Sequence, residues 1–117
     1  MFWADEVVSL IEKTFPNVKS FIVRDEKTAS GRVHVGSLRG VVIHGIIALA
    51  MAEKGHKVKY YYEINDQDPM DGMPVYLDKK NFLPHMGKPL KDVPSPESPD
   101  TPPTPEKNFA RYFGDEF

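Results

Sequence analysis

The sequence TASGRVHVGSLRGVVIHGIIALAMAEK, residues 28–54, decides the fold of this chain. Small residues at 29–31 predict a turn, and the apolar run that follows predicts a buried helix. The turn therefore leads into a helix N-terminus, whose first backbone N–H groups lack intrahelical partners and suit a phosphate. Gly36 lets a flat ring or a phosphate approach the backbone, and the ring N–H of His34 can donate to a phosphate oxygen. We expect the chemistry of the protein in this loop.

The segments on either side of this stretch predict one more helix and two strands. Apolar residues recur every fourth residue over about 3–15, which predicts an amphipathic helix. An apolar run at 21–23 predicts a short buried strand, and alternation over 57–64 predicts a second one. The helix between the strands has almost no polar face and is expected to end at Gly55, so we expect it to be covered on most sides.

A strand, a helix and a second strand predict a βαβ unit with a parallel sheet. Ligands of such sheets bind at the carboxyl ends of the strands, so the loops at 28–37 and 65–71 are expected to face each other. Two strands are too few for an independent parallel sheet. The pattern therefore predicts an α/β fold that is incomplete within these 117 residues.

The C-terminal part of the chain predicts little regular structure. One or two helical turns are expected within 75–82, and a proline-rich connection follows that cannot hold a central strand or helix; its prolines are Pro84, Pro89, Pro94, Pro96, Pro99, Pro102, Pro103 and Pro105. Aromatic residues at helical spacing predict an apolar face with little chain left to cover it: Phe109, Tyr112, Phe113 and Phe117. We therefore expect one domain part over 1–83 and a connecting part over 84–117.

Composition excludes several classes of protein. Fifteen basic against seventeen acidic residues give a net charge of -2, which excludes a global cationic surface for non-specific nucleic-acid binding. The chain has no cysteine and its four histidines lack metal-ligand spacing, so we expect neither disulfides nor a metal site. The longest apolar run, 41–52, is interrupted by His44 and Gly45 and is shorter than the ~20 residues of a membrane span. We expect a soluble, cytoplasmic protein.

Four stretches of the chain resemble, in order and spacing, the class I lysyl-tRNA synthetases. The phrase SGRVHVGS at 30–37 resembles the HIGH signature, which follows the first strand of a Rossmann-like (HUP-type) nucleotide-binding catalytic domain. Residues 65–74 resemble the family's Trp-Asp-Asp-x-Asp to Val-Pro segment. Residues 86–96 and 108–113 resemble its Leu-Gly-x-Pro to Ile-Pro-Asp-Pro and its Ser-Tyr-Ala-Glu-His-Phe segments. The resemblance covers nearly the whole chain from Thr28 onward.

This resemblance implies a lysine–tRNA ligase, which joins lysine to ATP and passes the lysyl group from the adenylate to tRNA(Lys). The implied catalytic residues are His34 and Ser37. The implied ATP-binding residues are Ser30, Gly31, His34, Gly36 and Ser37. Thr28, Asp66 and Asp68 match positions near the amino acid, where a carboxylate suits a substrate ammonium or the Mg²⁺ that accompanies ATP.

The chain departs from the family pattern at several positions. Ser37 stands where the family usually has Asn or His, Glu26 where it has Gly beside the amino acid, and Asn65 replaces the first Asp. The second signature of the class, KMSKS, is absent. The isolated chain is therefore not expected to complete the reaction, and the remainder of a synthetase is an expected partner.

Other interpretations stay open from the sequence. The arginine-specific synthetase has an HVGHLRG-like phrase that resembles residues 34–40, and other HIGH-type nucleotidyltransferases share the loop. A non-catalytic paralogue would keep the loop to bind a nucleotide or a partner. A His and a Gly before a helix also occur in plain connections of α/β proteins. The proline-rich stretch also fits an SH3-type ligand, although the matched Gly-x-Pro and Pro-Ser-Pro positions favour an ordered connection.

Overall fold

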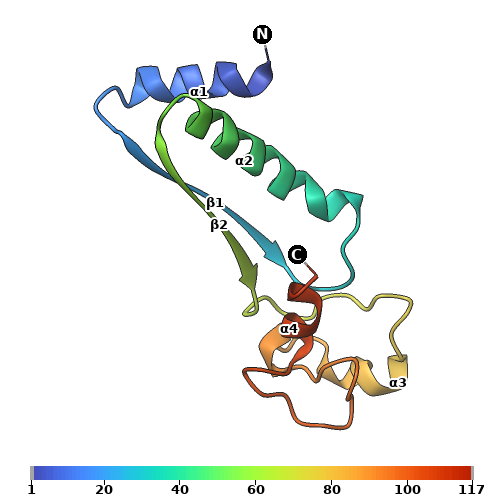
Figure 1. Cartoon of the computed structure of the whole chain (residues 1–117). Coiled ribbons are helices and arrows are strands. Elements are labelled where there is room, and N and C mark those ends of the chain that lie inside the picture. The colour runs from blue at the N-terminus through green and yellow to red at the C-terminus, as the bar shows by residue number, and fades with distance from the viewer. Residues whose placement is uncertain (1, 117) are drawn as a thin grey trace. The chain divides into compact units, whose positions relative to one another are not determined.

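Helices and strands follow one another along residues 2–116, which are the residues that the structure, a computed structural model, describes. The elements are α1 (Trp3–Thr14), β1 (Ser20–Thr28), α2 (Val35–Glu53), β2 (Lys57–Asn65), α3 (Lys79–Phe82), the 3₁₀ turns η1 (Leu83–His85) and η2 (Leu90–Asp92), and α4 (Phe109–Gly114) (Figure 1). They form two compact units. The first contains the chain up to Glu26 together with Val35–Glu63, and the second contains Lys27–His34 together with the chain from Ile64 onward. The predicted domain division at 83/84 stays a prediction.

The two strands pair in one sheet and run in the same direction (Figure 1), which confirms the predicted parallel pairing. Strand β2 alternates as its sequence predicts, with Val58 and Tyr60 less exposed than Lys57 and Lys59. Strand β1 is longer than predicted because its alternation continues through the charged residues 24–27. Their exposed members, such as Arg24, lie on the solvent side of the sheet, where charge is easily hydrated.

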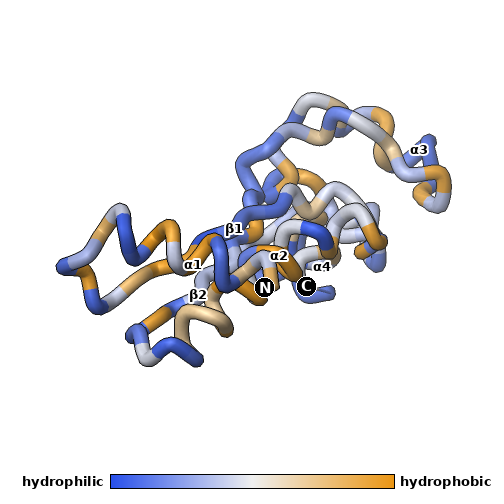
Figure 2. The backbone as a smooth tube through the Cα atoms, turned by 90° about the horizontal axis from the view of Figure 1, so that it is seen from above, coloured by the Kyte–Doolittle hydropathy of each residue, from blue (hydrophilic) through white to orange (hydrophobic). Residues whose placement is uncertain are grey.

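Both helices of the first unit contribute to its core. The apolar residues of α1 are interspersed with polar ones (Figure 2), and its apolar stripe packs against α2. The buried residues of this core are Ala4, Val8, Ala50 and Met51, packed with Ile11, Phe21, Val23, Ile46, Ile47 and Val58. The inward side chains of both strands thus meet the two helices. The helix between the strands ends as predicted: Gly55 has a φ of 87°, and its N–H donates to the Ala52 carbonyl at 2.9 Å.

Helix α2 is less covered than its composition predicts. In its described residues only Ser37, Ala48, Ala50 and Met51 are buried. Large apolar side chains on its other sides are exposed: Val35, Leu38, Val42, Ile43 and Leu49. The prediction of cover on most sides is therefore wrong for this chain, because the first unit offers only α1 and one sheet face to pack against.

The length of α2 also corrects the reasoning on membrane spans. The helix has 19 residues and a mean hydropathy of 1.7, so by length and composition alone it is apolar enough to cross a membrane. It runs without a break through His44 and Gly45, which the sequence pattern treated as interruptions. One such helix is weak evidence of a membrane span, since the core helix of a soluble protein can have the same length and composition.

The second unit is built around aromatic residues of α4. Phe109 and Phe113 are 0% and 1% exposed. Their buried neighbours come from the loops and short turns of the unit: Ala29, Met70, Phe82, Leu90, Val93 and Ala110. The prediction that little chain remains to cover this face is wrong, because the proline-rich connection itself supplies apolar cover. Phe117, the last member of the predicted face, lies outside the described residues.

Part of the proline-rich connection forms a repeated turn. The N–H of Ser98 donates to the Ser95 carbonyl at 3.0 Å, Thr101 donates to Ser98 at 3.0 Å, and Lys107 donates to Thr104 at 3.2 Å. Each turn has Ser or Thr first, Pro second and Asp or Glu third, which are favoured residues for β-turns. The segment therefore includes ordered turns.

The contacts of Glu12 are expected to make the stability of the first unit depend on pH. Its carboxylate lies 2.7 Å from His56 Nε2 and 3.6 Å from Lys54 Nζ. The hydrogen bond from His56, with the charge of Lys54, lowers the pKa of Glu12. A carboxyl group with a lowered pKa stabilises the fold above its unfolded pKa, about 4.3, and this contribution is lost as the pH falls through the folded value.

Glu12→Gln is therefore expected to lower the melting temperature near neutral pH and to have a smaller effect at about pH 3. Thermal unfolding followed by circular dichroism measures both differences. Glu97→Gln, at an exposed glutamate, is the matched control and should change neither. An equal fall in melting temperature for Glu12→Gln at both pH values would contradict the lowered pKa of Glu12.

Candidate active site

The predicted site residues fall in both units of the chain. Gly36 and Ser37 belong to the first unit, whereas the second contains Thr28, Ser30, Gly31, His34, Asp66 and Asp68. Helix α2 begins at Val35, so the predicted order of loop and helix N-terminus is confirmed. His34 is exposed immediately before the helix, and Ser37 is 5% exposed in its first turn. The loop thus presents a histidine ring to solvent directly before a helix N-terminus.

The ends of the two strands meet through side chains. The hydroxyl of Thr28, the last residue of β1, donates to the Asp68 carboxylate, which follows β2. The other oxygen of this carboxylate accepts from the Asn65 amide at 3.0 Å. The two predicted loops therefore do face each other at Thr28 and Asp68, as the rule for parallel strands predicts.

Asn65 has a role here that sequence reasoning missed. Its amide nitrogen donates to Asp68, and its amide oxygen accepts from the Gln67 backbone N–H at 3.1 Å. A second carboxylate at this position would repel Asp68 instead of donating to it. The amide of Asn65 therefore helps to orient the Asp68 carboxylate.

Two stretches that are distant in sequence pair through their backbones. The N–H of Lys91 donates to the Asp66 carbonyl at 3.0 Å, and that of Leu90 donates to Asp68 at 2.9 Å. Met70 donates to Lys88 at 2.8 Å, and an antiparallel bridge joins Pro69 to Pro89. The main chain around the two carboxylates is thus held by a second segment. Neither stretch alternates in hydropathy, so the sequence carried no signal of this pairing.

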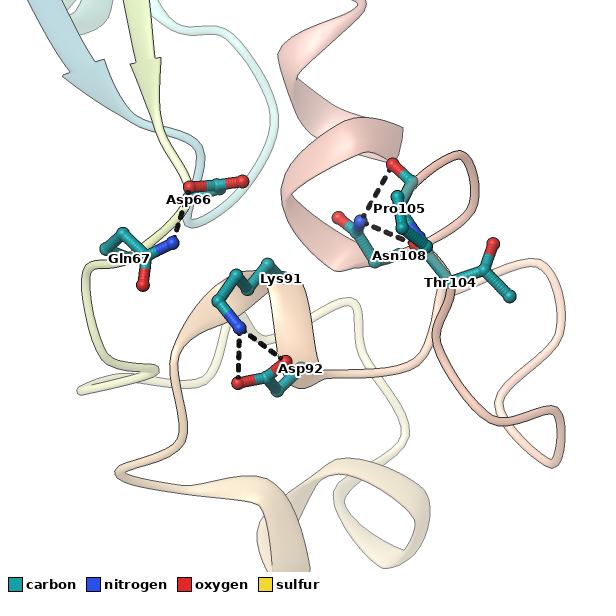
Figure 3. A network of polar contacts seen from close by, with 7 residues as sticks. All are labelled: Asp66, Gln67, Lys91, Asp92, Thr104, Pro105 and Asn108. Atoms are coloured by element: carbon teal, nitrogen blue, oxygen red, sulfur yellow. Dashed lines mark hydrogen bonds and ion pairs between the residues drawn. The ribbon is translucent and has the colours of Figure 1, made fainter.

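Asp66 lies beside a pocket of the second unit. The pocket is lined by residues at and just after the end of β2 and by residues in and on either side of α4, among them Asp66, Asn108, Arg111 and Asp115. Figure 3 shows the Asp66 carboxylate with its contact to Gln67, 3.4 Å from the amide nitrogen. In the same view, the Asn108 side chain donates to the Thr104 carbonyl at 2.8 Å. Asp66, directly after β2, thus brings a carboxylate to a pocket that Arg111 and Asp115 also line.

Residues 32 and 33, just before α2, are held by contacts within the second unit. The backbone N–H of Arg32 donates to the Tyr76 hydroxyl at 2.6 Å, and that of Val33 donates to Glu116 Oε2 at 3.0 Å. Sequence reasoning named neither partner, because an isolated tyrosine in an aperiodic segment gives no pattern. In the Val33 contact, a backbone N–H of this loop thus donates to an anionic oxygen of the same unit.

Titratable groups near the paired segments give no metal site. Burial, with the nearby charge of Lys88, lowers the pKa of His85, so its ring is neutral near pH 7. Within the described part of the chain, no three His, Asp or Glu side chains lie close enough to hold a metal ion.

Comparison with known proteins identifies the family. Residues 1–117 match the family described as tRNA synthetases class I (K), and the chain therefore belongs to that family. It is 29% identical to a lysine–tRNA ligase of Streptomyces coelicolor over 95% of this chain and 19% of that protein. It is 30% identical to the lysine–tRNA ligases of Methanococcus maripaludis and Thermoplasma volcanium, over 83% of this chain and 18% of each relative. The chain thus spans about a fifth of the length of these curated relatives.

Proposed function

We propose that this chain is the N-terminal part of the Rossmann-like (HUP-type) catalytic domain of a lysine–tRNA ligase. The observation that carries the proposal is the family match over the whole chain, with relatives of that name. The Thr28–Asp68 contact supports it, because it joins the two loops that bind the substrates in this interpretation. The exposed apolar residues of α2 and the open face of its two-stranded sheet fit a domain that continues beyond these residues.

ATP would bind at the loop before α2, through Ser30, Gly31, His34, Gly36 and Ser37. The lysine carboxylate attacks the α-phosphorus, the bond to the β-phosphate oxygen breaks, and pyrophosphate leaves. His34 would donate its ring N–H to an α-phosphate oxygen as negative charge builds there. Mg²⁺ would arrive with ATP and neutralise its phosphates. Catalysis of this kind depends on positioning and electrostatic stabilisation, which an exposed histidine before a helix N-terminus supplies.

Lysine would bind near the ends of the two strands, through Thr28, Asp66 and Asp68. A carboxylate suits the substrate ammonium because the hydrogen bond is charge-assisted. Asp66 borders a pocket, so it is available to a ligand, whereas Asp68 is oriented by Thr28 and Asn65.

The remaining parts of the proposal follow from the same assignment. The partners are lysine, ATP, tRNA(Lys) and the remainder of the synthetase, and the location is the cytoplasm. In this interpretation α2 is a core helix of the complete domain. The alternative is an arginine-specific synthetase or another nucleotidyltransferase of the same type, and amino-acid-dependent pyrophosphate exchange distinguishes them.

The test is lysine-dependent ATP–pyrophosphate exchange by the complete synthetase. Wild type is expected to exchange with lysine and not with arginine. Asp68→Asn, which removes one charge, is expected to raise the lysine KM about tenfold or more, the loss typical of a hydrogen bond to a charged group. The ATP KM should change little. Exchange driven by arginine alone would overturn the lysine assignment.

Asp92→Asn is the matched control for this substitution. Asp92 is an exposed aspartate whose carboxylate lies 2.8 Å from Lys91 Nζ. It takes part in none of the hydrogen bonds around Thr28 described above. It should leave both KM values unchanged. Equal effects of the two variants would mean that Asp68 contributes only general charge.

A further inference from the structure

Tyr76 contacts both Gly31 and Arg32 in the loop before α2. Its hydroxyl accepts the Arg32 backbone N–H at 2.6 Å. The Arg32 guanidinium lies over its ring, 4.6 Å from the centroid, which is a cation–π distance. A Cβ atom on Gly31 would lie 2.5 Å from the Tyr76 oxygen and 3.3 Å from Pro74 Cγ. A side chain at position 31 would therefore require Tyr76 or the loop to shift.

Tyr76 is itself anchored to the core of the second unit. Its ring lies 6.2 Å from that of Phe113, which is 1% exposed. The turn that carries Tyr76 is closed by the Leu77 N–H, which donates to the Pro74 carbonyl at 3.1 Å, and Leu77 packs on the buried cluster. The hydroxyl thus joins this turn to the loop before α2, across 44 residues of sequence.

We propose that Tyr76 is a positioning residue for ATP, which holds residues 31–34 in the conformation that receives the phosphates. The inference rests on the proposed function, because the ligand is the ATP of that reaction. Tyr76 does not touch the reacting atoms; it sets the direction of the Arg32 N–H and excludes a side chain at Gly31. A pre-formed loop binds phosphate without the entropy cost of ordering it first.

Tyr76→Phe tests the hydroxyl alone, because it keeps the ring for Arg32 and Phe113. The ATP KM in lysine-dependent exchange is expected to rise on the order of two- to tenfold, the loss of one hydrogen bond, with kcat and the lysine KM unchanged. The Arg32 amide should exchange its hydrogen at least several-fold faster. The Met70 amide, bonded to Lys88 at 2.8 Å, is the internal reference and should not change.

A double-mutant cycle separates positioning from general stability. Gly31→Ala is expected to raise the ATP KM strongly in the wild-type background, since its Cβ meets the Tyr76 oxygen at 2.5 Å. Without the hydroxyl the nearest atoms are Pro74 Cγ at 3.3 Å and Tyr76 Cζ at 3.8 Å, so Tyr76→Phe should partly rescue Gly31→Ala. Tyr61→Phe, at an exposed tyrosine of β2, should change neither the KM values nor the effect of Gly31→Ala.

Each outcome decides the proposal. An unchanged ATP KM in Tyr76→Phe, or strict additivity with Gly31→Ala, would overturn it while exchange by the wild type keeps the proposed function intact. If the wild type neither exchanges nor binds ATP, the proposed function fails and the nucleotide role of Tyr76 fails with it. In that case the hydrogen-exchange rate of the Arg32 amide still measures whether Tyr76 holds the loop.

Discussion

Replacing His34 with alanine is expected to slow lysine-dependent ATP–pyrophosphate exchange by the complete synthetase about a hundredfold or more. The expected size is that of removing one donor from a site that stabilises developing charge. His34 is exposed directly before α2, so its loss removes a donor and leaves no buried cavity. The effect should therefore appear in kcat, and the melting temperature should stay close to that of wild type.

Two further variants make this prediction specific. His34→Asn keeps a side-chain N–H donor and should recover part of the lost rate. His85→Gln removes a histidine that lies in η1 and contacts Lys88 at 3.3 Å, outside the proposed ATP site, and should leave kcat unchanged. An unaltered rate in His34→Ala would sink the catalytic assignment. It would favour the alternative in which the loop binds a nucleotide or a partner without catalysis.

The arrangement around Thr28 illustrates what sequence could predict. Alternation marked β2, continuous hydropathy marked α2, and the rule for parallel strands placed the loop after each strand at one edge. The Thr28–Asp68 contact follows from those three local signals. It needed no knowledge of side-chain packing, because strand ends are positioned by backbone pairing.

Tyr76 and Leu90 illustrate what sequence could not predict. Leu90 is fully buried in a proline-rich segment, and its N–H donates to the Asp68 carbonyl. Tyr76 meets Arg32 across 44 residues. Neither residue belongs to a repeat of period 2 or 3.6, so no periodic signal distinguishes it from a surface residue. Contacts of this kind depend on where irregular chain returns to the core.

The repeated β-turn of the proline-rich connection could be predicted from the sequence only in part. Ser95, Ser98 and Thr104 each begin a turn with Pro second and an acidic residue third. That pattern is visible in the sequence, and it favours turns over an extended polyproline helix. The number of prolines alone does not reveal this pattern, since it predicts only where helices and central strands are absent.

Phe109→Ala is expected to lower the free energy of unfolding by about 3–5 kcal/mol, the range for deleting a buried aromatic ring. Phe109 is 0% exposed, and its ring lies 4.9 Å from that of Phe113 and 5.8 Å from that of Phe82. Its backbone N–H donates to the Val93 carbonyl at 2.9 Å, so the alanine side chain cannot easily shift to fill the space. Urea unfolding of the 117-residue chain, followed by circular dichroism, measures the loss.

Phe15→Ala is the matched control, because this phenylalanine is 53% exposed and its loss should cost less than about 1 kcal/mol. Phe109→Leu preserves most of the buried volume and should cost less than about 1.5 kcal/mol, so it remains measurable if Phe109→Ala does not fold. Equal losses for Phe109→Ala and Phe15→Ala would mean that α4 has an uncovered apolar face, as its sequence predicts. A loss confined to Phe109 would instead mean that the proline-rich connection is part of the core, since Leu90 and Val93 supply the cover.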